Sequence, residues 1–415
     1  TQPATGETYP KSDLFNKAVT AFNSENEVII MQDFIYHNPV KILFGRDQIS
    51  ALAQEVPQGK KVMIVYGGGS VIKHGILKRV KESLTNTLVY EFGGVEANPH
   101  YETLMKAVEI VRTEKIDFLL AVGGGSVIDG TKFIAAAALY ENDPWEIVKS
   151  YGGVVKQALP FGCVLTLAAT GSEMNNTAVI NRVTTQDKLF FTSPYVMPKF
   201  SVLEPEMTYT LPEQQTANGV VDAFVHVLEQ YITYPVNAKV QDRLAEGLLS
   251  TLKEEGPVAL KNPQNYDARA NIMWAATMAL NGMLSAGVPT DWASHMIGQE
   301  ITALYGIDHA RTLAIVMPAL WRLCKKEKAE KLAQYGARVW NIPESDSEKM
   351  ADEAINATVE FFELMGVKTR LSDYGLGAED ISAVIGKLKE HGHIALGEHG
   401  KITAEVAETI LNMAL

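Results

Sequence analysis

One carboxylate and three histidines are spaced along the second half of this chain in a way that suits a metal ion: Asp222, His226, His295 and His309. If Asp222 and His226 lie on one helix, their separation of four residues puts both side chains on one face, roughly 5–6 Å apart at Cβ. Three imidazoles and one carboxylate suit Zn²⁺ or Fe²⁺ and not Ca²⁺ or Mg²⁺. A buried polar network without a metal has the same spacing, and the sequence leaves that alternative open.

Two glycine-rich turns upstream have the composition of nucleotide-binding turns. The Gly-Gly-Gly-Ser turn at 123–126 follows a strand-like run and precedes a helical pattern, so its backbone and the helix N-terminus could approach a phosphate closely. The turn departs from the Gly-x-Gly-x-x-Gly register of the Rossmann fingerprint, so a plain tight turn remains an alternative. A metal ion and a dinucleotide in one protein indicate hydride transfer.

The second Gly-Gly-Gly-Ser turn, at 67–70, bears on which dinucleotide is bound. Nucleotide folds often place an acidic residue at such a strand end, where it binds the ribose 2′-OH and repels a 2′-phosphate. Here the turn holds only small residues and a hydroxyl, with Lys73 nearby. The turn therefore favours NADP(H) over NAD(H).

Strand-like and helical segments alternate through the first half of the chain. Strand-like runs at 61–66, 87–92, 118–122 and 161–169 are separated by helical patterns. This alternation predicts an α/β domain with a Rossmann-like, mostly parallel sheet covered on both faces. The segment 184–188 with Lys188 reads by itself as a solvated loop.

The pattern changes after about Leu211, where strand signals nearly vanish and helix-forming residues dominate. We expect helix breaks at Gly256-Pro257, at 287–289 and at Gly306. The predicted organisation is a polar N-terminal extension (1–30), an α/β dinucleotide-binding domain (31–211) and an all-α metal-binding domain (212–415). Because the glycine-rich turns precede the boundary and the metal residues follow it, we expect the active site in the cleft between the domains.

Charge and composition exclude several classes of function. The formal net charge is −12 and the basic residues form no tract, which argues against nucleic-acid binding. No apolar run approaches ~18 residues, so no transmembrane helix is expected, and the first 26 residues do not resemble a signal peptide. Cys163 and Cys324 lie in apolar surroundings and are expected to be free thiols, which fits a cytoplasmic protein.

A second group of histidines lies near the C-terminus: His391, His393 and His399. Two glycines interrupt this segment, and the histidines have no helical spacing. We expect a solvated loop that binds metal weakly at most.

Taken together, these features resemble the iron-containing (group III) alcohol dehydrogenases, and most closely the branch of NADPH-dependent aldehyde reductases and butanol dehydrogenases. The resemblance runs from about Phe34 to the C-terminus. The segments that carry it are 38–45 (NPVKILFG), 98–99 (NP), 123–129 (GGGSVID), 169–173 (ATGSE), 217–226 (ANGVVDAFVH) and 306–310 (GIDHA).

The resemblance implies interconversion of small aldehydes and primary alcohols with NADP(H), a homodimer, and a divalent metal ion at the four residues named above. Fe²⁺ is usual in the family, and Zn²⁺ occurs in relatives. It also matches Lys188 to a cofactor-binding lysine. The full set of cofactor-binding residues that it implies is Gly67, Gly68, Ser70, Asn98, Gly124, Gly125, Ser126, Asp129, Thr166, Thr170 and Lys188.

One position departs from the family pattern, because many relatives carry a further histidine where this chain has Gln299. Gln299 does not titrate near neutral pH, but it can still hydrogen-bond a substrate or water. Two other functions remain open. A dehydroquinate synthase-like lyase would need a basic cluster beside the metal residues, where only Arg311 is near; a non-catalytic nucleotide-binding protein would hold a structural metal.

Overall fold

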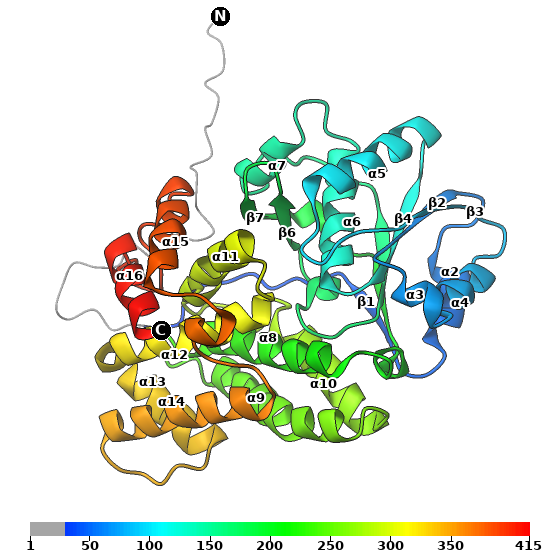
Figure 1. The fold of residues 1–415 in the computed structure, drawn as a ribbon. Coiled ribbons are helices and arrows are strands. Elements are labelled where there is room, and N and C mark those ends of the chain that lie inside the picture. Colours follow the sequence, from blue (N-terminus) through cyan, green and yellow to red (C-terminus); the bar gives the residue numbers. More distant parts are fainter. Residues whose placement is uncertain (1–29) are drawn as a thin grey trace, which may run out of the picture.

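The chain folds into an α/β part followed by a helical part (Figure 1). A computed structural model describes residues 30–415, so all but the last residue of the predicted N-terminal extension, 1–30, lies outside the described residues. The sheet and its covering helices lie on one side of the molecule, and the helices that follow Leu203 lie on the other. The predicted fold class is confirmed.

All six strands of the main sheet are parallel, as the alternation of strands and helices predicted. The order across the sheet is β1-β8-β5-β4-β2-β3, so β1 and β3 are the edge strands. The strands are β1 (Lys41–Phe44), β2 (Lys61–Tyr66), β3 (Leu88–Phe92), β4 (Phe118–Gly123), β5 (Phe161–Leu165) and β8 (Phe200–Leu203).

Both faces of this sheet are buried because its strands are apolar at successive positions. Side chains alternate between the faces, so Met63 and Val65 of β2 join one hydrophobic cluster while Val62 and Ile64 join another. Helices α5 (Tyr101–Glu114) and α6 (Gly125–Ala137) belong to the first cluster. The second cluster includes residues of η1 (Gln48–Ala51), α2 (Leu52–Glu55), α3 (Ser70–Lys73) and α4 (Ile76–Ser83).

A separate antiparallel hairpin, which the sequence did not predict, is formed by β6 (Thr177–Arg182) and β7 (Asp187–Thr192). It packs against α6, α7 (Trp145–Lys149) and α11 (Ala293–Tyr305). The interpretation of Lys188 as a solvated loop residue is wrong, because Lys188 lies in β7 and is only 4% exposed. Short 3₁₀ helices connect these elements: η2 (Ser172–Met174), η3 (Pro194–Val196) and η4 (Pro205–Thr208).

After Leu203 the described chain is helical apart from one isolated bridge between Leu396 and Ile402. The predicted break at Gly256-Pro257 is wrong, because one helix runs through both residues. A Cβ on Gly256 would lie 2.9 Å from Val220 Cγ1, so the glycine permits a close helix contact there. The helices are α8 (Glu213–Tyr231), α9 (Lys239–Lys261), α10 (Tyr266–Ala279), α11, α12 (His309–Leu323), α13 (Lys325–Val339), α14 (Ser347–Leu364), η5 (Leu371–Tyr374), α15 (Ala378–Glu390) and α16 (Ala404–Met413).

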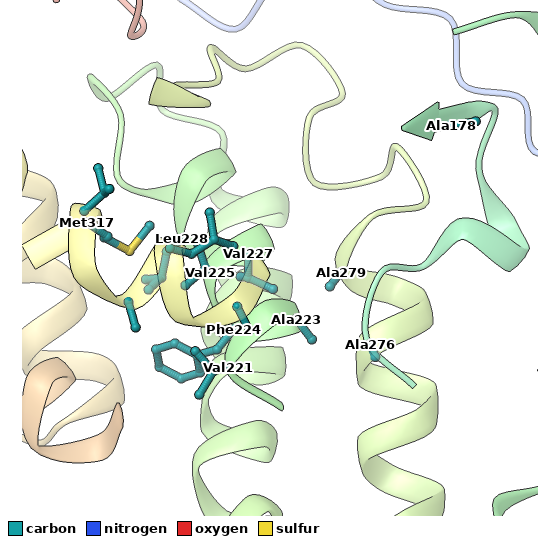
Figure 2. Close-up of a cluster of buried hydrophobic side chains, with 14 of the residues drawn as sticks. Ala178, Val221, Ala223, Phe224, Val225, Val227, Leu228, Ala276, Ala279 and Met317 are labelled. Carbon is teal, nitrogen blue, oxygen red and sulfur yellow. The ribbon is translucent and has the colours of Figure 1, made fainter. Parts of the chain in front are cut away.

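Helix α8 lies at the centre of the helical part and packs against α9, α10 and α12. Every residue from Thr216 to Tyr231 is buried. Figure 2 shows its apolar side chains, including Phe224 and Leu228, together with Met317 of α12. A helix held on several sides in this way fixes the positions of its few polar side chains.

Candidate metal and nucleotide site

A cavity of about 780 Å³ lies between the carboxyl ends of the strands and the helical part, and it is lined by residues of both. This is where open parallel sheets bind ligands. The predicted site residues that line it are Asn98, Gly124, Gly125, Ser126, Asp129, Thr170, Lys188, Asp222, His226, His295, Gln299 and His309.

The four predicted metal residues meet at one wall of this cavity. Asp222 Oδ1 lies 3.8 Å from both His226 Nδ1 and His309 Nε2. The ring of His295 stacks on that of His226, with centroids 4.8 Å apart. Three helices supply the side chains: α8 carries Asp222 and His226, α11 carries His295, and α12 begins at His309.

Each of the four side chains has a buried polar atom without a protein partner. Asp222 Oδ1, His226 Nδ1 and His295 Nε2 are buried without a hydrogen bond, and so is His309 Nδ1. Buried polar atoms in native proteins are nearly always satisfied, so four such atoms in one cluster need an explanation. A set of three imidazoles and a carboxylate fits a divalent transition metal ion.

Burial also keeps the histidines in the protonation state that a metal ligand needs. It lowers the pKa of His226 to about 4 and that of His295 to about 3, and it lowers the pKa of His309 well below its ordinary value. All three imidazoles are therefore neutral near pH 7, with a lone pair available. Burial raises the pKa of Asp222, and a nearby cation would oppose that rise.

The turn at the start of α6 also lines the cavity. A Cβ on Gly125 would lie 2.4 Å from Thr170 Oγ1, so only glycine allows this close approach. Asp129 accepts hydrogen bonds from Ser172 Oγ at 2.5 Å and from the backbone N–H of Val179 at 2.9 Å, so both of its oxygens are engaged within the protein. Gly124, Gly125 and Ser126 of this turn line the cavity at the N-terminus of α6, where a phosphate group could bind.

Three of the predicted cofactor residues are joined by hydrogen bonds. The backbone N–H of Asn98 donates to Ser126 Oγ at 3.2 Å, and Lys188 Nζ donates to Asn98 Oδ1 at 2.8 Å. Burial lowers the pKa of Lys188 to about 8. Segments far apart in the sequence are thus linked at the cavity wall.

Family models of iron-containing alcohol dehydrogenases match residues 39–205 and, for the C-terminal part of the family, residues 216–415. The chain is 58% identical over 386 residues to the NADPH-dependent aldehyde reductase YqhD of Escherichia coli, covering 92% of this chain and 100% of that protein. The chain belongs to the iron-containing alcohol dehydrogenase family.

Other members of the family agree in sequence and structure. The probable NADH-dependent butanol dehydrogenase 1 of Bacillus subtilis is 43% identical, over 93% of this chain and 100% of that protein. The crystal structure of E. coli YqhD superposes with a TM-score of 0.92 at 57% identity, covering 93% and 100% of the two chains. That of the NADH-dependent butanol dehydrogenase A of Thermotoga maritima gives 0.89 at 34% identity, covering 93% and 99%.

Sequence reasoning missed a buried carboxylate beside the predicted metal residues, Glu229. Glu229 Oε2 lies 2.6 Å from His295 Nδ1, and the carboxylate also accepts from the backbone N–H groups of Ser294 and His295. The signal was present, because Glu229 follows Asp222 by seven residues and therefore shares its helix face. A carboxylate on Nδ1 leaves Nε2 of His295 free to face a metal ion.

Trp292 is a second missed residue. Its backbone has φ 62°, in the left-handed region that non-glycine residues rarely adopt, and it directly precedes α11. The indole meets the ring of His295 edge-on at 5.1 Å. Strain of this kind persists only where the surrounding packing enforces it.

Asp308 lies at the N-cap position of α12, but its side chain does not cap the helix. Its Oδ2 instead accepts from Gln214 Nε2 at 2.9 Å and Asn218 Nδ2 at 2.8 Å. These bonds tie the start of α12, which carries His309, to α8.

Four predicted cofactor residues do not line the cavity: Gly67, Gly68, Ser70 and Thr166. Gly67 and Gly68 lie in the loop after β2, and Ser70 begins α3. This loop lies next to the loop after β3 through the bond from Gly94 N–H to Gly67 O. Nothing lies within 4 Å of a Cβ built on Gly68. This loop is an open surface beside the cavity.

The substrate-side position Gln299 is buried and lines the cavity on α11, about one helical turn beyond His295.

No helix in residues 30–415 is both long and apolar enough to cross a membrane.

The segment 391–399 forms a non-helical loop, as expected, and Gly392, Ile394 and Ala395 are exposed, but its histidines are not solvated as predicted. None of its three histidines is exposed, and the side chain of His391 is 7% exposed because two carboxylates enclose it.

Proposed function

We propose that this protein reduces small aldehydes to primary alcohols with NADPH and a divalent metal ion, Fe²⁺ or Zn²⁺. The observation that carries the proposal is the cluster of unpartnered donor atoms at Asp222, His226, His295 and His309, at the wall of the cavity that also holds the glycine-rich turn. The relative named as an NADPH-dependent aldehyde reductase, at 58% identity, supports the same activity.

Each wall of the cavity has a separate task in this reaction. The four donor residues would hold the metal ion, and the backbone of the turn at 124–126 would receive the cofactor diphosphate at the N-terminus of α6. Bound there, the metal ion supplies Lewis-acid polarisation of a carbonyl group and NADPH supplies hydride. Lys188 and Asn98 would orient the cofactor, and Gln299 would hydrogen-bond the substrate or a water molecule.

The cofactor preference rests on the loop after β2. We propose that the loop with Gly67, Gly68 and Ser70 accepts the 2′-phosphate of NADPH, because it is open and has no acidic residue. Relatives are named for NADPH and for NADH, so we infer the cofactor preference of this chain from the residues of its own loop. In Gly68→Asp the new carboxylate should weaken NADPH binding about tenfold or more and favour NADH; the same change at the open, exposed Gly247 is the matched control.

The remaining proposals concern assembly and location. The edge strand β1 follows a segment with exposed Met31, Phe34 and Ile35, and an unpaired edge beside apolar residues supports a homodimer. The free cysteines support a cytoplasmic location. The change from strands to helices between Leu203 and Glu213 supports a domain boundary near Leu211. Light scattering on the purified protein tests the dimer.

NADPH oxidation with butanal tests the activity. Metal-stripped protein would be refilled with Fe²⁺ or Zn²⁺ and compared with Asp222→Ala and with NADH as the reductant. Turnover that needs both the metal ion and Asp222 is the expected result. If metal-loaded protein reduces neither butanal nor a wider panel of aldehydes, the proposal fails in favour of a lyase or a non-catalytic protein.

A further inference from the structure

His391 lies between two carboxylates that come from different elements. Its Nδ1 is 2.7 Å from Glu300 Oε1 of α11, and its Nε2 is 3.1 Å from Asp187 Oδ1 of β7. Ionised carboxylates only accept hydrogen bonds, so both ring nitrogens must donate. A neutral imidazole has one N–H group, and the triad is therefore complete only when His391 is an imidazolium.

The two carboxylates are direct neighbours of residues that line the cavity. Asp187 precedes Lys188 in β7, and since successive side chains of a strand point to opposite sides, holding Asp187 outward directs Lys188 inward. Glu300 follows Gln299 in α11, the helix that also carries His295. His391 directly follows α15, which packs against α11. One side chain thus joins the cofactor side of the cavity to the substrate side.

The two carboxylates beside His391 differ in their other hydrogen-bond partners. Asp187 also receives Lys387 Nζ at 3.3 Å and the hydroxyl of Thr185 at 2.6 Å, whereas the second oxygen of Glu300 has no hydrogen-bond partner. Lys387 itself pairs with Glu390, and both precede His391 in α15. Other titratable groups near the triad are His393, whose ring lies 6.1 Å from that of His391, and Tyr151 and Lys188, on whose pKa values the charge of Glu300 acts upward.

Electrostatics agree with a charged His391. Burial alone lowers its pKa, but the hydrogen bonds and charges of Glu300 and Asp187 outweigh burial and raise the pKa above 6.5. Burial raises the pKa of Glu300, and the hydrogen bond from His391 opposes that rise. Loss of the proton would leave a buried carboxylate without its cation, which is costly.

We propose that His391 is a positioning residue for the reaction: as an imidazolium it holds the β6–β7 hairpin against α11 and so keeps Lys188 placed for the cofactor. The inference rests on the proposed function, since it assumes that Lys188 contacts NADPH. When His391 loses its proton, one hydrogen bond of the triad is lost and the hairpin is held less firmly. NADPH affinity should therefore fall with rising pH, while kcat changes less than the affinity.

The test is NADPH binding to metal-loaded wild-type, His391→Gln, Asp187→Asn and His399→Gln proteins between pH 6 and 9. His399→Gln is the matched control, because it removes a histidine of the same segment that stacks on Tyr234. At pH 6 we expect His391→Gln and Asp187→Asn to weaken binding about three- to tenfold, up to the value of one charge-assisted hydrogen bond. For His391→Gln the ratio of its NADPH dissociation constant to that of wild type should approach one at high pH. His399→Gln should match wild type at every pH.

A second measurement does not depend on the cofactor. Hydrogen exchange of the hairpin 177–192, without NADPH, should be faster in His391→Gln than in wild type, with unchanged exchange in α14. In Glu300→Gln the loss of NADPH affinity with rising pH should have a lower midpoint pH than in wild type, because one carboxylate that favours the imidazolium is gone.

The outcomes separate the two proposals. Wild-type protein that fails to bind NADPH overturns the proposed function, and unchanged hairpin exchange in His391→Gln overturns the positioning role. An affinity loss that is the same at every pH also overturns it, because a merely structural side chain would give that result.

Discussion

Two clusters of histidines and carboxylates within residues 30–415 are similar in composition and differ in the partners of their atoms. One donor atom each from Asp222, His295 and His309 lies within 4.8 Å of the others, and the same holds for Glu300, His391 and His393. The first set keeps buried atoms without a partner on every member, whereas both ring nitrogens of His391 are bonded to carboxylates.

Proximity of possible ligands therefore does not by itself distinguish a metal site from an ion triad. Burial without partners is unfavourable for the first cluster unless a metal ion binds there. In the second cluster the carboxylates already satisfy His391, so a metal ion bound through either ring nitrogen would have to displace a hydrogen bond. We therefore expect the first cluster to bind metal and the second to act through a proton.

The largest effect is expected when a donor residue is removed from the first cluster. Asp222→Ala should lose the metal ion and lower the rate of aldehyde reduction by at least about a thousandfold, since Lewis-acid stabilisation is worth several kcal/mol. Metal content after dialysis, measured by elemental analysis, checks the first point. His391→Ala is the comparison and should keep its metal; retention of metal by Asp222→Ala would contradict the assignment.

A smaller effect is expected behind the first cluster. Glu229→Gln should weaken metal binding about tenfold, at the low end for such supporting residues, because the amide oxygen still accepts from His295 Nδ1. Competition with a chelator measures the affinity without an activity assay. Glu246→Gln is the matched control, since Glu246 is another buried glutamate whose partners are Tyr231, Arg243 and Arg338. Equal losses in both variants would argue against a specific role of Glu229.

A pH-dependent contribution to stability is expected from His391 in the second cluster. The pKa of His391 is raised above 6.5 in the folded protein, so its contribution to stability is complete below that pH and is lost as pH rises through the folded pKa. Wild type should melt on the order of a few degrees above His391→Gln near pH 6. The gap should close at alkaline pH, and thermal melts across the range measure it. A gap that widens with pH would show that His391 is neutral.

The smallest effect is expected from His393, which would matter only if the second cluster bound a metal ion. His393→Gln should leave the metal stoichiometry unchanged and activity within about twofold of wild type, as for most substitutions away from a site. Titration with Zn²⁺ measures the stoichiometry. A loss of one bound ion in this variant would show that Glu300, His391 and His393 form a metal site.

Much of the fold follows from local patterns in the sequence. The run 118–122 and the helical pattern at 101–114 are continuous apolar or periodic segments, and β4 and α5 lie there. The β6–β7 hairpin was missed because half of the residues in each of its strands are polar, so neither strand stands out as an apolar run. The predicted break in α9 at Gly256 was wrong. Glycine is favoured there by a close contact with Val220, which lies on another helix, so the local pattern gives no sign of it.

The candidate site was predictable where one helix carries its residues. The spacing of Asp222 and His226 predicted a shared face, and α8 presents both at the cavity. The partner of His391 could not be predicted, because Asp187 and Glu300 are 204 and 91 residues away in the chain. Whether a histidine meets a carboxylate or an unpartnered donor depends on the packing of distant elements.

The most direct test of this comparison is a crystal of metal-loaded protein measured at the absorption edge of iron or zinc. The account predicts one anomalous peak among Asp222, His226, His295 and His309, and no peak between Glu300, His391 and His393. A peak only at the second cluster, or none at the first in catalytically active protein, would contradict it.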